Sequence, residues 1–177
     1  MNYEMSNNFN YEMNKLTIIT IVLIFLVVLF TFKSLIIPFI LVLLIQCAVY
    51  ILMGIINILD MKVYYLSLLI VQGILMGATI DYAILFTNYY RELRKENSIR
   101  ISLKETYNKS IHTILTSSLI MIIITGVLGF VFKDPAIGEI CHIIAIGVTI
   151  AVLLILFVLP SIIVLFDKKI VNNKSKS

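Results

Sequence analysis

One long apolar segment, Gln72 to Arg94, reads QGILMGATIDYAILFTNYYRELR and carries a single acid in its middle, Asp81. An ionised carboxylate near the centre of a bilayer costs roughly 2.5 to 3.5 kcal/mol on insertion scales. Such a residue therefore normally faces protein or water rather than lipid, and it usually has a function. Asp81 is the first candidate for a functional residue in this chain.

The composition predicts an integral membrane protein. Hydrophobic residues make up 60% of the 177 positions and charged residues 14%, whereas a soluble domain carries about a quarter charged residues. The apolar blocks are long enough to cross a hydrocarbon core about 30 Å thick as helices, and none alternates as a barrel strand would. We therefore expect an all-α transmembrane bundle with five spans: Leu16 to Phe32, Leu35 to Leu59, Tyr64 to Tyr90, Ile111 to Phe132 and Ile137 to Phe166.

The bases between the blocks predict the orientation, since cytoplasmic loops collect Lys and Arg. With the amino terminus outside, eleven bases face the cytoplasm and three face outward. The inner set is Lys33, Arg91, Arg94, Lys95, Arg100, Lys104, Lys109, Lys168, Lys169, Lys174 and Lys176, and the outer set is Lys15, Lys62 and Lys133. We expect a multi-pass protein of the cell membrane with an outer tail (1–15), a membrane domain (16–166) and a cytoplasmic basic tail (167–177). No basic region precedes the first block, so a signal peptide is not expected.

The charged loop over residues 91–110 contains a second pattern. Apolar residues recur there every four positions: Ile99, Leu103, Tyr107 and Ile111. Ser102 and Glu105 have the spacing of a capping box. These features predict a short amphipathic helix on the inner membrane surface. The basic side of this helix either contacts anionic headgroups or is simply solvated. In the last block, Pro160 is expected to kink the helix or loosen its final turns.

The residues around Asp81 predict a helix-packing seam. Gly73, Gly77 and Asp81 recur in steps of four and share one helix face, which Asn88 continues. The glycines form a small-xxx-small pair that lets another helix approach closely. Asp81 then either handles a proton or only hydrogen-bonds a neighbour to hold the bundle. Burial disfavours the charged form of a carboxyl and a nearby donor favours it, so modest changes of surroundings can load or release a proton.

Polar residues on other helices are candidates to surround this acid. Tyr82 lies about 100° around the helix from Asp81, so its hydroxyl is expected to reach another helix. Thr116, Ser117 and Ser118 in the fourth block lie at about the depth of Asp81. Such hydroxyls often bond only their own backbone, which is the alternative for each of the three.

The sequence gives little support for catalysis. His112 and His142 are predicted near opposite membrane surfaces, so they cannot share a metal, and no phosphate-binding glycine loop or CxxC pair is present. An intramembrane aspartyl protease needs two membrane carboxylates, but Asp60, Asp134 and Asp167 all lie at span ends. We therefore expect no enzyme activity, no metal or other cofactor and no nucleic-acid partner, with membrane lipids as the surroundings.

The segment GATIDYAILFTNYYREL resembles the glycine-then-Asp-Tyr helix of the MMPL group in the resistance-nodulation-division (RND) transporter superfamily. SLIIPFILVLLIQCAVYILMGI is similar to the family's preceding span and SIHTILTSSLIMIIITGVLGFVF to its following span. Residues 137–170 resemble its last span, including the closing LPSIIVLFD. Each motif is soft by itself, but their order and spacing are specific over Leu16 to Ile170.

The resemblance implies a permease that couples inward proton flow to the efflux of lipids, drugs or other amphiphiles. By position, Asp81 and Tyr82 would form the proton relay, with Asp81 as acceptor and Tyr82 as its hydrogen-bonding companion. A full member has twelve spans in two similar halves, each with a large outer domain, and this chain matches the five-span part of one half. The expected partner is the remainder of such a transporter (one span, the outer domain and the second half) or further copies of the chain. The alternative is a structural or sterol-sensing-like bundle, or a vestigial fragment, that binds partners or lipid without transporting.

Overall fold

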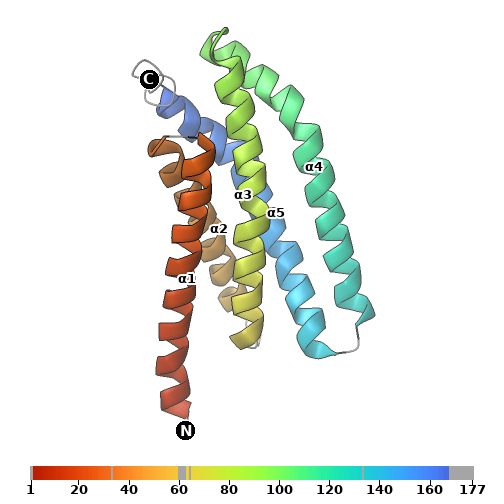
Figure 1. Cartoon of the computed structure of the whole chain (residues 1–177). Helices are drawn as coiled ribbons and strands as arrows, with labels where there is room; N and C mark the ends of the chain where they lie inside the picture. Colours follow the sequence, from red (N-terminus) through yellow and green to blue (C-terminus); the bar gives the residue numbers. More distant parts are fainter. Residues whose placement is uncertain (1, 33, 60–62, 64, 133, 168–177) are drawn as a thin grey trace.

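The computed structural model describes residues 2–32, 34–59, 63, 65–132 and 134–167. In these ranges the chain forms five helices and no strand: α1 (Asn2–Phe32), α2 (Ile36–Ile58), α3 (Tyr65–Leu93), α4 (Ile99–Val131) and α5 (Pro135–Leu165). The helices run alternately up and down in chain order, so α1, α3 and α5 finish at the same end of the bundle (Figure 1). We call this the α3–α4 end. The predicted all-α bundle is confirmed.

The boundaries differ from the predicted blocks at two places. α1 extends back to Asn2 through the residues expected to form a tail. α4 begins at Ile99, so the predicted surface helix and the fourth span form one continuous helix, because no proline or other strong helix breaker separates them. Ser102 therefore lies inside a helix and caps none; its N–H donates to the Ser98 carbonyl at 2.9 Å.

The surface of the bundle is that of a membrane protein. Within the described residues, four helices are long and apolar enough to cross a membrane: Ile36–Ile58, Ser67–Leu93, Ile99–Val131 and Ala136–Leu165. The apolar part of α1, Thr17–Phe32, is shorter. Large apolar side chains such as Phe30 and Phe130 point outward and are 85% and 84% exposed. Hydrocarbon favours a surface of this kind and water does not, so the chain is a multi-pass membrane protein.

Among the five helices α3 contacts all four others, and α5 packs against α2, α3 and α4. The start of α5 is fixed by Asp134, whose carboxylate accepts a hydrogen bond from the Ala136 N–H at 3.0 Å, and by Pro135 in the first turn. Both residue types favour a helix start, where N–H groups lack partners within the helix. At Gly147 the helix passes so close to its neighbours that an added Cβ would lie 3.0 Å from Leu52 and 3.2 Å from Leu75.

Where α4 ends and α5 begins, the close packing of the two helices depends on Gly129. A Cβ at this position would lie 2.5 Å from two ring atoms of His142, whose Nδ1 is hydrogen-bonded to the Gly138 carbonyl at 2.8 Å. Gly129→Ala is therefore expected to lower the free energy of unfolding by about 1 to 3 kcal/mol through overpacking, measured by thermal unfolding in detergent. Gly126→Ala is the matched control in α4, since its Cβ meets no atom within 4 Å. Equal losses in the two variants would contradict the close crossing.

Candidate functional site

One exposed face of α3 combines small and polar residues: Gly73, Gly77, Asp81 and Asn88. We call these four residues the glycine–aspartate strip. Asp81 lies near the middle of its span, about 21 Å from Ser67 and about 18 Å from Leu93 at 1.5 Å per residue. Asp81 therefore lies near the middle of a helix that is long and apolar enough to cross a membrane.

No described part of the chain covers the strip. A Cβ built on Gly73 or Gly77 would meet no atom within 4 Å, and the Asp81 carboxylate has no hydrogen-bond or ion-pair partner among the described residues. The structure therefore places no helix of its own in the predicted seam, and the packing of another helix there stays a prediction. A lone carboxylate at this depth is unfavourable in lipid by a few kcal/mol, so the strip needs a partner or water.

Tyr82 points to another helix, as its position one residue after Asp81 predicts. Its hydroxyl lies 3.2 Å from Oγ of Ser117 in α4, within hydrogen-bond distance. Ser118 is buried and bonds a carbonyl of its own helix at 3.1 Å, whereas Thr116 is exposed. Of the three candidates on α4, the structure thus brings Ser117 to Tyr82, and within the described contacts it brings none to the acid.

The inward side of α3 carries a second set of functional groups. Phe86, Tyr90 and Arg94 follow one another in steps of four and share a face. Phe86 and Tyr90 are fully buried. Tyr90 lies nine residues after Asp81, which is about 180° around a helix of 100° per residue. α3 therefore separates the open strip from a polar cluster inside the bundle.

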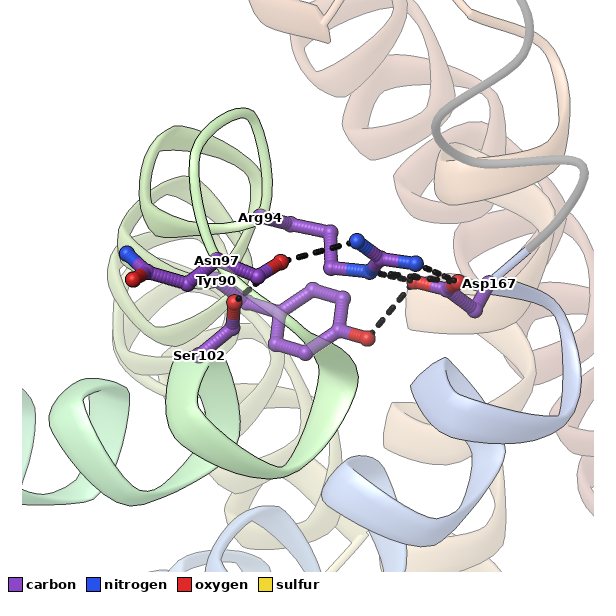
Figure 2. A network of polar contacts seen from close by, with 5 residues as sticks. All are labelled: Tyr90, Arg94, Asn97, Ser102 and Asp167. Carbon is purple, nitrogen blue, oxygen red and sulfur yellow. Dashed lines mark hydrogen bonds and ion pairs between the residues drawn. The ribbon is translucent and has the colours of Figure 1, made fainter.

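Asp167, just after α5, binds this inward face. The residue is 4% exposed, and its carboxylate accepts a hydrogen bond from the Tyr90 hydroxyl at 2.7 Å. Arg94 donates from Nε to Oδ1 and from Nη2 to Oδ2, each at 3.1 Å (Figure 2). Paired guanidinium bonds of this kind are strong and directional. The hydrogen bond to Asp167 raises the pKa of Arg94 above its ordinary value, so the guanidinium stays charged at physiological pH. We call these three residues the Asp167 clasp.

The clasp also fixes the connection between α3 and α4. Nη1 of Arg94 donates to the Asn97 carbonyl at 2.9 Å, and Oγ of Ser102 reaches the same oxygen at 3.5 Å (Figure 2). The Asn97 side chain donates to the Leu93 carbonyl at 3.2 Å, one of the terminal carbonyls that lack a donor within α3. The end of α3, the start of α4 and the end of α5 are therefore joined in one network.

α1 is attached to α3 by polar contacts at two depths. Near the α3–α4 end, Nη1 of Arg91 donates to the Phe32 carbonyl at 3.2 Å, and the guanidinium lies 5.3 Å from the Phe32 ring centre. A cation is favourable there because the last carbonyls of a helix lack donors and carry negative dipole charge. Toward the other end, Nε2 of Gln72 donates to Oγ1 of Thr17 at 2.6 Å.

The sequence patterns do not single out the clasp, because they place Asp167 only at the end of a span. A signal is nevertheless present in the sequence: Tyr90 and Arg94 are four residues apart, and a carboxylate follows directly on the long apolar run of α5. Within the described residues, no three His, Cys, Asp or Glu side chains are grouped so that they could hold a metal ion.

Comparison with known proteins shows which family the chain resembles. The model of the MMPL family matches residues 1–177, the whole length of the chain. No curated protein and no solved structure matches significantly.

Proposed function

Because the chain belongs to the MMPL family, we propose that it forms part of the membrane domain of an RND-type transporter that couples proton entry to the export of lipids, drugs or other amphiphiles. One observation supports this proposal most directly. Asp81 lies in the middle of a membrane span, on an exposed strip, without a partner in the described chain. In this proposal Asp81 is the proton acceptor.

The chemistry of Asp81 suits that role. In a dry apolar environment the neutral form of a carboxyl is favoured, and an approaching donor or water favours the ionised form. A conformational change that dries the strip would therefore load a proton onto Asp81, and one that wets the strip would release it. An intramembrane ionisable residue is typical of proton relays in transporters.

Tyr82 contributes indirectly. Its hydroxyl is next to Ser117 of α4, so this tyrosine helps to hold the rotation of α3 about its axis and with it the direction of Asp81. A hydroxyl or amide donor for the acid then has to come from outside the described chain. The relay is therefore completed by a residue of the partner.

The proposed partner is a second helical bundle packed on the glycine–aspartate strip. The absence of side chains at Gly73 and Gly77 lets the backbone of another helix approach closely, and a helix there would shield Asp81 from lipid. This bundle is either the remainder of an RND-type transporter, with its outer domain and second half, or another copy of the chain.

The α3–α4 end is proposed to face the cytoplasm and the amino terminus the outside of the cell membrane. Among the described residues, six bases lie at or near that end: Arg91, Arg94, Lys95, Arg100, Lys104 and Lys109. Lys15 lies near the other end. This asymmetry supports the orientation, since bases near span ends stay in the cytoplasm.

The test is a proton-flux measurement on the assembled protein, purified with its partners and reconstituted into vesicles. With an imposed pH gradient and a fluorescent lipid as cargo, the expected result is cargo movement that stops when an ionophore collapses the gradient. Proton flux is read in parallel from a dye enclosed in the vesicles. Cargo and proton signals equal to those of protein-free vesicles would contradict transport and favour a bundle that only binds lipid or partners.

A further inference from the structure

Pro160 interrupts the hydrogen bonding of α5 about one and a half turns before its end. In an α-helix the N–H of residue 160 would donate to the carbonyl of Leu156, but proline has no N–H. Both Leu156 and Pro160 are buried in the bundle. A buried carbonyl in a membrane protein finds no lipid donor, so another protein group has to satisfy it.

Tyr107 of α4 supplies that donor. Its hydroxyl hydrogen-bonds the Leu156 carbonyl oxygen, across the gap between the two helices. The ring of Tyr107 is held edge-on by Phe86 of α3, with ring centres 5.4 Å apart and planes at 78°. Three helices therefore meet at the interruption, and the missing bond of α5 is replaced by a side chain of a different helix.

Besides its own helical hydrogen bonds and the buried side chains of Leu159 and Ile163, the segment 157–167 is held by two polar contacts from other helices. At the near end, the hydroxyl of Tyr107 donates a hydrogen bond to the Leu156 carbonyl, which has no donor in its own helix. At the far end, Tyr90 and Arg94 hold the carboxylate of Asp167. Both contacts come from α3 or α4, and both are polar bonds of the kind that can open and close without a change of fold.

We propose that residues 157–167 form an arm hinged at Pro160, and that the Tyr107 hydroxyl closes the hinge by taking the place of the missing residue-160 amide. Opening this bond lets the arm pivot away from α3 while the rest of α5 stays packed. The hinge lies on the inward side of α3, away from the open side that carries Asp81.

The first test is a double-mutant cycle on the full chain in detergent, with the unfolding midpoint as readout. Tyr107→Phe removes the hydroxyl and keeps the ring, so it is expected to lower the midpoint. Pro160→Ala restores an N–H to residue 160, so in that background Tyr107→Phe is expected to have almost no effect. The hydroxyl control is Tyr50→Phe, because Tyr50 is 68% exposed on α2. Equal effects of Tyr107→Phe in the two backgrounds would overturn the proposal.

The second test follows the arm itself and needs only the conservative Tyr107→Phe variant. Spin labels are placed on Lys104 of α4 and on Leu165 in the arm, with Cys47 and Cys141 replaced by Ala. Tyr107→Phe is expected to broaden the Lys104 to Leu165 distance distribution. A matched pair, Lys104 and Leu153, reports on α5 before the hinge and is expected to keep its width; both label sites on α5 are exposed. No broadening, or the same broadening in both pairs, would overturn the hinge.

Discussion

Asp81→Asn is expected to abolish proton-coupled transport while the chain still inserts and folds. The amide has nearly the shape of the acid but cannot bind and release a proton. No contact of the described chain is lost, because Asp81 has no partner there, and surface substitutions of this kind change stability little. The measurement compares gradient-driven cargo flux per folded protein, with the unfolding midpoint recorded for both forms.

Two further variants separate proton chemistry from packing on the strip. Asn88→Ala removes a polar group from the same face without touching a titratable residue, so it is expected to retain coupling. A Cβ at Gly77 would meet no atom within 4 Å, so a loss of flux in Gly77→Leu is expected to come from blocking the partner helix. Wild-type flux in Asp81→Asn would rule out Asp81 as the proton acceptor.

The fold was predictable because span length and hydropathy alone define most of it. The error at α4 shows the limit of periodicity: the apolar pattern changes near Ile111, yet a change of pattern does not end a helix when no breaker is present. Ser102 had the right spacing for a cap, but α4 starts at Ile99, and the buried Ser102 packs inside the bundle instead.

The candidate site was predictable where it depends on one helix. The rotation of 100° per residue predicts that Asp81 and Asn88 lie on the same helix face and that Tyr82 lies on a different one. Ser117, the partner of Tyr82, is one of three hydroxyls predicted to surround Asp81, and the described contacts bring none of the three to that acid. The Asp167 clasp was not predictable, because it depends on which helix end lies beside α3, and the order of the spans does not determine their neighbours.

The two faces of α3 give this helix a double role. Asp81 lies on the open side, and Tyr90 lies about 180° away on the side bound to α5. A helix moves largely as a rigid body, so a shift of α3 that follows protonation on one face also acts on the clasp on the other. The structure therefore provides a contiguous path from the proposed proton site to the hinged arm, and a demonstrated two-state change in the arm is what would establish coupling.

Asp167→Ala is expected to give the largest loss of stability among the variants of the clasp and of the strip. It leaves the guanidinium of Arg94 without its counter-charge and the buried Tyr90 hydroxyl without its acceptor. Breaking a fully buried pair costs about 3 to 5 kcal/mol. The side chain of Arg94 is 24% exposed and keeps access to water, so we expect a loss of about 2 kcal/mol, measured by unfolding in mixed micelles.

The controls for this loss follow from the same geometry. Glu96→Ala removes an exposed carboxylate from the same end of the bundle and is expected to change stability by less than about 0.5 kcal/mol. Tyr90→Phe removes one hydrogen bond to Asp167 and should cost about 1 kcal/mol. Adding Arg94→Ala to Asp167→Ala should cost less than the sum of the two single changes, because the unpaired charge disappears. Strictly additive losses of stability would show that the two residues stabilise the fold separately. They would contradict the interpretation that the clasp anchors the arm.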